Sequence, residues 1–371
     1  MSRAPFTFYE FFAGGGMTRL GLGPGWGCLF ANDFDPLKAA TYRANFGDGH
    51  FREADVFDLT AGDLPGIADL AWASSPCQDF SLAGARAGLA GGRSSAFFGF
   101  WRLIEGLSAQ GRAPRTVAIE NVTGLLTSHG GVDFAAVCGA LAGQGYRFGA
   151  IEVDAASFLP QSRRRVVIVG AREWAGSSDP SPCESHSVRR AREGLPAHLR
   201  RGWIGWGRTP PQGRNTNLSA LLEPDEAAIW QGAARTERMI EMMNPRHRAK
   251  VRAAMAGGER RVGAMFLRVR GGVQRAEVRF DGLAGCLRTP RGGSSRQAVI
   301  VVEAGRVRSR LMSPRETARL MGLPDSYALP SAANAALHVT GDGVAAPVVR
   351  WLAREVLEPL LGPTPAVLAA E

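Results

Sequence analysis

The sequence is almost without lysine. Lys occurs only at positions 38 and 250, so nearly all basic side chains are arginines, and the 371 residues carry a formal net charge of +10. A GC-rich genome explains the choice of arginine over lysine, but not the excess of positive charge. Because the planar guanidinium suits phosphates and guanine edges, we expect a polyanionic partner.

The chain also lacks the cysteine patterns of disulfide and zinc proteins. Its cysteines are odd in number and form no C-x-x-C pair, so we expect neither a disulfide framework nor a metal site. The five positions are Cys28, Cys77, Cys138, Cys183 and Cys286.

Long apolar runs are absent as well. No stretch of 18 apolar residues occurs, and residues 1–5 begin no signal-peptide core, so we expect a cytoplasmic protein without a membrane span. A hydrophobic fraction of 45% is enough for a normal core.

About the first 170 residues alternate between apolar runs and amphipathic stretches, which predicts an α/β fold with a mostly parallel sheet covered by helices on both faces. The helices are expected near residues 36–45, 95–109 and 134–143. The strands are expected at residues 6–12, 27–33, 70–75, 116–122, 150–154 and 165–170.

The composition changes after Ala171. The following residues are rich in Gly, Pro, Arg and Ser, but they include tryptophans and phenylalanines that a disordered linker would lack. Near the end, Ser313, Pro314 and Glu316 form a capping box that starts a helix. We therefore predict four parts, which are a catalytic and cofactor-binding domain at 1–172, a smaller loop-rich domain at 173–305, a hinge and return segment at 306–340, and a C-terminal helix at 341–371.

A glycine-rich loop, Glu10-Phe-Phe-Ala-Gly-Gly-Gly-Met17, follows the first predicted strand. Glycines at a strand-to-helix turn let the backbone approach a ligand closely. Asp33 and Asp55 follow the next two strands, where carboxylates can bind a nucleoside that lacks a pyrophosphate. Helix capping is the alternative for both aspartates.

Two reactive side chains follow neighbouring strands. Pro76-Cys77 ends the run that starts at Leu70, and Glu120 ends the run that starts at Thr116. A thiol and a carboxyl at one sheet edge suit covalent chemistry with acid assistance. The alternative for Cys77 is a small buried apolar residue.

Taken together, these elements resemble the DNA cytosine-5 methyltransferase family of prokaryotic or phage type. The resemblance covers nearly the whole chain outside Glu173–Gly285, and six pieces occur in the family order. They are Phe12-Ala-Gly-Gly-Gly, Pro76-Cys-Gln, Glu120-Asn-Val, Gln161-Ser-Arg-Arg-Arg165, the segment Arg310–Asp325, and Gly341-Asp-Gly-Val344.

The resemblance implies a Rossmann-like fold that uses S-adenosyl-L-methionine as methyl donor. By position, Phe12 would stack on the adenine, Asp33 would hold the ribose, and Asp55 would meet the adenine edge. Gly14 and Gly16 would shape the methionine end. The cofactor set implied by the family also includes Ala13, Phe34, Val56, Pro76, Asp342 and Val344.

The resemblance also implies the chemistry, which is methylation of C5 of a cytosine flipped out of double-stranded DNA. Cys77 would add to C6, and Glu120 would contact N3 and the exocyclic amine. Arg165 would hold both Glu120 and the base O2, and Arg163 would join it in favouring the Cys77 thiolate.

The loop-rich domain would recognise the target sequence. Arg288, Arg291 and Arg296 lie among glycines and are candidate DNA contacts. The segment Gln78–Ala96 would close over the flipped base, with Ser81 and Arg93 as its DNA contacts.

We expect a monomer associated with the nucleoid. A cognate restriction endonuclease acting on the same site without direct contact stays open. A tRNA cytosine-5 methyltransferase and a non-catalytic DNA-binding protein on the same fold are the alternative functions.

Overall fold

The structure is a computed structural model, and it describes residues 5–76, 96–174, 181, 183–214, 216–289 and 296–362. The chain forms two compact units. The first comprises the described residues within Met1–Val153, Arg164–Pro210 and Val348–Glu371, and the second those within Asp154–Arg163 and Pro211–Pro347. The four functional parts expected above stay a prediction, because compactness alone assigns no function.

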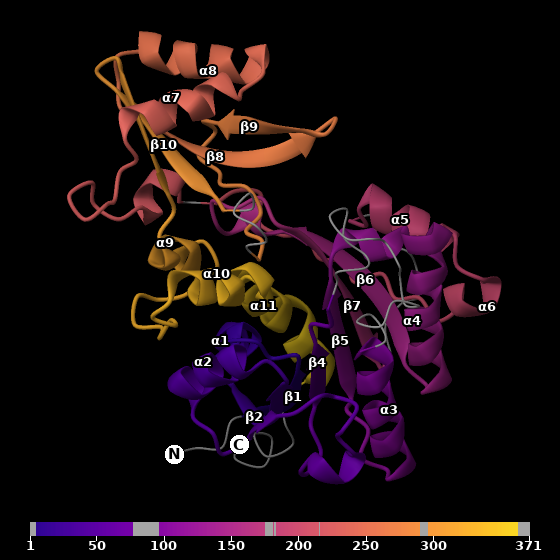
Figure 1. Cartoon of the computed structure of the whole chain (residues 1–371). Helices are drawn as coiled ribbons and strands as arrows, with labels where there is room; N and C mark the ends of the chain where they lie inside the picture. Colours follow the sequence, from indigo (N-terminus) through magenta and orange to yellow (C-terminus); the bar gives the residue numbers. More distant parts are fainter. Residues whose placement is uncertain are drawn as a thin grey trace, which may run out of the picture. The chain divides into compact units, whose positions relative to one another are not determined.

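A seven-stranded sheet forms the centre of the first unit, with the strand order β3-β2-β1-β4-β5-β7-β6 (Figure 1). The pairs β1–β2, β2–β3, β1–β4 and β4–β5 are parallel, whereas β7 runs antiparallel to β5. The strands are β1 (Phe6–Phe11), β2 (Trp26–Asp33), β3 (Phe51–Glu53), β4 (Leu70–Ala73), β5 (Thr116–Asn121), β6 (Arg147–Asp154) and β7 (Arg164–Ala171).

Helices cover both faces of this sheet, as the sequence predicts. On one face, α3 and α4 bury side chains such as Phe100 and Leu141 against Tyr9 and Ile168 of the strands. On the other face, α2 packs Ala39 and Tyr42 against the sheet. The helices of this unit are α1 (Met17–Leu22), α2 (Pro36–Phe46), α3 (Ala96–Ala109), α4 (Val132–Gly143), α5 (His186–Glu193), α6 (Ala197–Arg200), α11 (Ala346–Leu352) and α12 (Glu358–Leu361). The first two residues of α11 precede Val348, where the last segment of the unit starts.

The strand order places a ligand-binding edge at the middle of the sheet. Strand β1 lies between β2 and β4, so the chain moves outward in opposite directions from β1. In open α/β sheets, ligands bind outside the carboxyl ends of the strands at such a reversal. The glycine-rich loop leaves β1 at this point.

The second unit contains regular structure that the irregular sequence pattern did not indicate. Its four strands form an antiparallel sheet in the order β11-β10-β8-β9. Met239 of α7, Val251 of α8 and Met243 between the two helices pack against it. The elements are α7 (Ala233–Glu241), α8 (Pro245–Ala256), β8 (Arg261–Arg270), β9 (Val273–Arg279), β10 (Ala298–Glu303), β11 (Arg306–Leu311), α9 (Pro314–Arg319) and α10 (Ala333–Asp342).

Helix α9 begins at the predicted capping box. The Ser313 side chain accepts a hydrogen bond from the Glu316 backbone N–H, and the Glu316 carboxylate accepts one from the Ser313 N–H. Glu316 also forms a buried two-pronged ion pair with Arg310, at 2.6 and 2.7 Å. One carboxylate therefore fixes the helix start and neutralises a buried arginine.

Candidate active site

The glycine-rich loop is held by its neighbouring strand. Phe12 adopts a left-handed backbone with φ of 56°, and the next N–H, of Ala13, donates to the carbonyl of Asn32 at 2.8 Å. The Gly14 N–H donates to Asp33 Oδ2 at 2.9 Å. The loop is thereby fixed in a shape that turns the chain sharply from β1 into α1.

Two glycines of the loop differ in what surrounds them. A Cβ added at Gly16 would lie 2.4 Å from the Phe46 ring, whereas one at Gly14 would meet nothing within 4 Å. Both residues have positive φ. Gly16 is therefore required by packing inside the unit, and Gly14 borders open space that a ligand can occupy.

Asp33 and Asp55 both accept backbone hydrogen bonds, but the side chain that caps α2 is that of Asp35. Asp33 is buried, and its second oxygen accepts the Asp35 N–H at 3.0 Å. Burial, opposed by Lys38, raises the pKa of this carboxyl. Asp55 is exposed and accepts the Phe57 N–H at 3.0 Å.

The remaining predicted cofactor residues of this unit also lie near strand ends. Phe34, next to Asp33, exposes 63% of its surface, an unusual position for a large apolar ring. Phe12 and Pro76 are half-buried, and Ala13 and Val56 are buried. Their chemistry fits a nucleoside with one apolar face and a polar edge.

A buried polar cluster lies behind this loop, and sequence reasoning missed it. Arg19 of α1 contacts His50 and donates to Tyr42 Oη at 3.3 Å, and Tyr42 also lies 3.6 Å from Cys28 Sγ. Glu10 of β1 is fully buried, and burial raises its pKa to about 8. Burial and the nearby Arg19 lower the pKa of His50 to about 4. Only the position of Glu10 between Tyr9 and Phe11 in an apolar strand hinted at a buried acid.

The carboxyl ends of β4 and β5 are tied together. Ala73 of β4 pairs with Ile119 of β5, and the Asn121 amide donates to Ser75 Oγ at 3.3 Å. Ser75 and Asn121 are both buried. This contact, which the sequence did not indicate, holds the residues just before Cys77 beside the end of β5. Cys77 itself lies outside the described residues.

Glu120 and Arg165 form a close ion pair in the first unit. Arg165 Nε lies 3.0 Å from Glu120 Oε1, and the two side chains are only 15% and 9% exposed. The antiparallel register of β5 and β7 brings them together, since Glu120 pairs with Val167, two residues beyond Arg165. The register of the two strands therefore produces the contact between Arg165 and Glu120 that the sequence predicted.

Arg163 belongs to the second unit. Its guanidinium donates to the carbonyls of Leu287, Gly341 and Gly343 at 2.9, 3.1 and 2.6 Å, and it lies 3.4 Å from Cys286 Sγ. The side chain is 2% exposed. These contacts give Arg163 a role in joining chain segments that are distant in sequence.

The other predicted residues of the second unit lie around these segments. Asp342 accepts a hydrogen bond from the Thr289 hydroxyl, and Val344 is buried. Arg288 is exposed, and the half-buried Arg296 donates to the Asn334 side chain. The predicted DNA contacts Ser81, Arg93 and Arg291 lie outside the described residues.

Two further observations concern only the part of the chain that the structure describes. No three His, Cys, Asp or Glu side chains gather there closely enough to hold a metal ion. None of its helices is both long and apolar enough to cross a membrane.

Structural comparison shows the same fold in known methyltransferases. Entamoeba histolytica methyltransferase EhMeth aligns with a TM-score of 0.62 at 13% identity, covering 97% of this chain and 100% of that one. S. pombe Dnmt2 methyltransferase aligns with a TM-score of 0.59 at 18% identity, covering 96% and 99%. These likenesses confirm the predicted Rossmann-like methyltransferase fold.

Sequence comparison finds Type II methyltransferases. M.HpaII of Haemophilus parainfluenzae is 26% identical over 96% of this chain and 91% of its own length, and M.NlaX of Neisseria lactamica is 27% identical over 95% and 96%. M.BsuFI of Bacillus subtilis is 35% identical, but over only 47% of this chain and 41% of its own length.

The family of C-5 cytosine-specific DNA methylases matches residues 6–358. The match spans the glycine-rich loop, both strand ends of the candidate site and the second unit. It confirms the resemblance drawn from the six motifs, and with it the predicted enzyme class, DNA (cytosine-5-)-methyltransferase. The chain therefore belongs to the C-5 cytosine-specific DNA methylase family.

Proposed function

We propose that this protein methylates C5 of a flipped-out cytosine within a short specific sequence of double-stranded DNA, through a covalent bond between Cys77 and C6 of the base. The Type II names of its relatives support the DNA substrate and a place in a restriction-modification system. The observation that carries the proposal is the joined edge of β4 and β5, with the Glu120–Arg165 pair at one strand end and Cys77 following the other.

Family membership implies S-adenosyl-L-methionine as methyl donor. The predicted cofactor residues fit this methyl donor. Gly14 borders open space, and the exposed ring of Phe34 lies next to the buried carboxylate of Asp33. Phe12 and Phe34 would contact the adenine, Asp33 the ribose, and Asp55 the adenine edge. When bound, the donor supplies an electrophilic methyl group.

Cys77 would make the base reactive. C5 of cytosine is a weak nucleophile, and addition of the thiolate to C6 converts the ring into an enamine whose C5 can attack a methyl group. Afterwards a base removes the C5 proton, and the electron pair of that bond expels the Cys77 thiolate. Flipping the cytosine out costs a few kcal/mol of stacking and pairing.

Glu120 and Arg165 would assist this addition. As negative charge develops on the ring, Glu120 would share a proton with N3 and so make C6 more electrophilic. Arg165 keeps Glu120 in position through the 3.0 Å contact and would also hold the base O2. Arg163 would act indirectly, by holding the backbone segments it contacts.

The experiment that tests the proposal is bisulfite sequencing of genomic DNA from a methylation-free host that expresses the chain. We expect methylated cytosines within one short sequence, and none with Cys77→Ala. Methylation of tRNA alone would favour the RNA alternative. DNA binding by soluble protein without methylation of either nucleic acid would favour a non-catalytic role.

A further inference from the structure

Glu10 is a buried ionisable residue that the proposed chemistry does not use. It lies in β1, at the start of the glycine-rich loop segment, and is only 1% exposed. Among the residues that the structure describes, no donor reaches either of its carboxyl oxygens with hydrogen-bond geometry. Burial raises its pKa to about 8, although Arg19 and Thr18 of α1 oppose this rise. Near neutral pH the carboxyl therefore keeps its proton, and a modest rise in pH ionises it.

Charged and titratable side chains face Glu10 from α1, α2 and the neighbouring strand β2. Arg19 of α1 favours the ionised carboxylate, whereas Asp33 of β2 disfavours it as a like charge. Cys28 of β2 and Tyr42 of α2 also lie within electrostatic reach of Glu10. Burial raises the pKa of Cys28 to about 12 and that of Tyr42 above its usual range, so both side chains stay neutral near pH 8.

Two further neighbours complete these surroundings. Trp72 of β4 pairs with Glu10 on the other side of β1 and carries no charge. His50 contacts Arg19, and burial together with Arg19 lowers the pKa of His50 to about 4. His50 is therefore neutral near pH 7. Glu10 is the member of the polar cluster that changes its charge between pH 7 and pH 9.

Arg19 links this cluster to the glycine-rich loop. It donates to Tyr42 Oη at 3.3 Å, and its Cζ lies 4.8 Å from the centre of the Phe46 ring. Gly16 packs on the same two rings, since a Cβ added there would lie 2.4 Å from Phe46 and 3.0 Å from Tyr42. The rings that Arg19 contacts are therefore the rings that support the loop.

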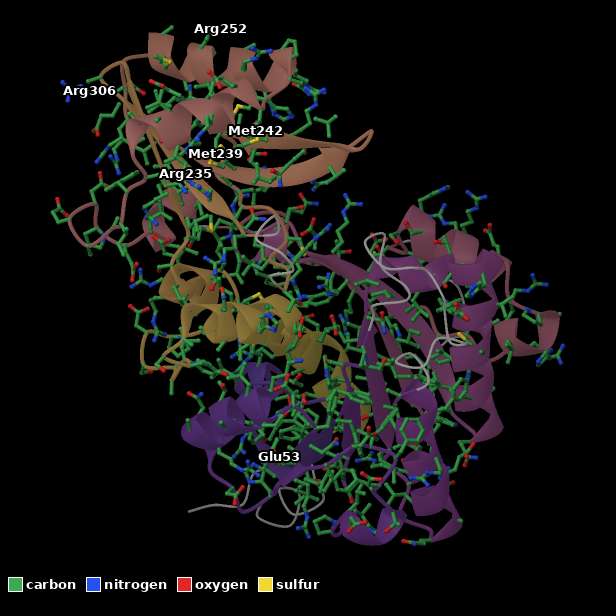
Figure 2. The ribbon with its side chains drawn as sticks, viewed as in Figure 1. Glu53, Arg235, Met239, Met242, Arg252 and Arg306 are labelled. Carbon is green, nitrogen blue, oxygen red and sulfur yellow. The ribbon has the colours of Figure 1, made fainter. Side chains whose placement is uncertain are left out.

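Helix α2, which carries both rings, is anchored independently of Arg19. At its start, the Asp35 side chain accepts the N–H of Leu37 at 2.9 Å. Near its end, Arg43 pairs at 2.6 Å with Glu53, the last residue of β3, which is labelled in Figure 2. Because α2 is held at both ends, a change in the contacts of Arg19 acts on α1 and the loop.

We propose that Glu10 and Arg19 position the glycine-rich loop for the methyl donor, and that donor binding favours the form of Glu10 that keeps its proton. When Glu10 releases this proton to solvent, the buried carboxylate needs a counter-charge. Arg19 supplies it by turning away from Tyr42 and His50, which weakens the support under Gly16. A ligand that holds the loop opposes this change, so ionisation must weaken the ligand in return.

Both residues act through the loop, so they are positioning residues. The proposal rests on the proposed function, because it takes the donor to bind at this loop. It gives the buried acid of β1 a role in the pH dependence of donor binding.

The test measures ligand binding to the full chain by calorimetry at pH 7 and pH 9. The probes are S-adenosyl-L-homocysteine and 5′-methylthioadenosine, and the second has no group that titrates in this range. We expect wild-type affinity for both to fall by up to roughly tenfold, the change that about one pH unit above a pKa produces. Glu10→Gln, which mimics the protonated form, should keep its affinity. An unchanged wild type, or an equal fall in Glu10→Gln, would overturn the proposal.

Two other variants separate positioning from general loosening of the structure. Phe46→Leu weakens the contact with Gly16 without changing any charge, so it should lower affinity by the same factor at both pH values. Arg19→Gln removes the cation that favours ionised Glu10, so the fall in affinity should move to higher pH, whereas Arg19→Lys should keep it near the wild-type pH. A fall at the same pH in Arg19→Gln would show that the two residues are not coupled.

Hydrogen exchange of residues 13–22 without ligand tests the loop itself. Wild type should exchange faster than Glu10→Gln at pH 9, and the two should match at pH 7. If wild type binds neither probe but shows this exchange pattern, the donor assignment fails and the coupling of Glu10 to the loop stands. If both probes bind equally at the two pH values, only the present inference fails. Unfolding midpoints show which variants fold, and the wild-type titration with 5′-methylthioadenosine tests the proposal without any variant.

Discussion

The Glu120–Arg165 ion pair depends on the direction of strand β7. The sequence placed Glu120 at the end of one apolar run and Arg165 at the start of another, but it did not show that β7 runs antiparallel to β5. That direction brings the start of β7 beside the end of β5, and so Arg165 within 3.0 Å of Glu120. The pair is largely buried, so removal of either side chain would leave the other without its counter-charge.

Glu120→Gln tests the proposed proton sharing at N3. The amide keeps the shape of the side chain but cannot release or accept the proton, so we expect kcat for methyl transfer to fall by roughly 10²- to 10⁴-fold. Arg165→Lys, which keeps the charge but loses the guanidinium fork, should cause a smaller loss. Single-turnover transfer of labelled methyl groups measures both, and near-normal rates for Glu120→Gln would exclude the assigned role.

Glu10 predicts a pH dependence of stability. Its pKa rises on folding from the ordinary 4.5 to about 8, because burial disfavours the charged form. Between these values the unfolded chain has released a proton that the folded chain retains, so this residue lowers the free energy of unfolding as the pH rises through that window. Thermal unfolding of Glu10→Gln should therefore show a gain over wild type that is larger at pH 8 than at pH 5. An equal effect at both pH values would contradict the assignment.

In the glycine-rich loop, Gly14 and Gly16 have the same kind of backbone conformation but different surroundings. Gly14 and Gly16 share positive φ, so alanine at either position costs about 1 kcal/mol or more of backbone strain. Only Gly16 also has the Phe46 ring against it. The sequence marked both residues as cofactor contacts, and only the packing distinguishes them.

Two alanine variants make this distinction measurable. Gly16→Ala should lower the unfolding midpoint more, through the clash with Phe46. Gly14→Ala should keep more stability but weaken binding of S-adenosyl-L-homocysteine in calorimetry, because its methyl group enters the open space. The assignment of Gly14 to the cofactor site would be wrong if its variant bound the ligand as tightly as wild type.

The capping box of α9 was predicted correctly because all of its residues lie within four positions. Arg310 was not seen as its partner, since no local pattern shows that both side chains are buried. Likewise, the Asn121–Ser75 contact and the carbonyl partners of Arg163 join residues from about 45 to 180 positions apart. Local periodicity and motifs therefore predicted most strands of the first unit, the glycine-rich loop and the catalytic candidates, whereas the sheet of the second unit and the long-range partners required the structure.

Glu316 offers a test of this buried pair. Glu316→Ala leaves Arg310 buried without its carboxylate and removes half of the capping box, so we expect a loss of about 3–5 kcal/mol in the free energy of unfolding. Ser313→Ala removes only the cap and should cost about 1 kcal/mol. Urea denaturation of both variants measures the difference, and similar losses would mean that the ion pair contributes little.

At the scale of the whole molecule, the first unit is completed by a distant piece of chain. This piece starts at Val348, and seven of its apolar side chains are buried. They are Val348, Val349, Leu352, Ala353, Val356, Leu357 and Leu361. Trp26 Nε1 donates to Glu358 at 3.1 Å, and Arg350 donates to the Leu20 carbonyl at 3.3 Å. Burial of each larger side chain contributes roughly 1.5–3 kcal/mol, and the sum is comparable with the whole stability of a domain.

A chain ending at Pro347 should therefore fail to fold its first unit. We expect it to lose cofactor binding and to bind a hydrophobic dye, whereas a chain ending at Gly362 keeps every residue of the buried set and should behave as wild type. Calorimetry and dye fluorescence check both outcomes. Normal cofactor affinity in the shorter chain would show that the packing of this piece is dispensable.

Because the first unit is built from segments that are distant in sequence, it cannot complete its fold early during translation. Strands β1 to β6 leave the ribosome well before residues 348–362, because that segment begins roughly 200 residues after the end of β6. At a bacterial translation rate that interval lasts about 10–40 s. During that interval the nascent chain exposes the apolar surface that residues 348–361 later cover, including that around Trp26. The unit that carries the glycine-rich loop can therefore complete its fold only after the whole second unit has been synthesised.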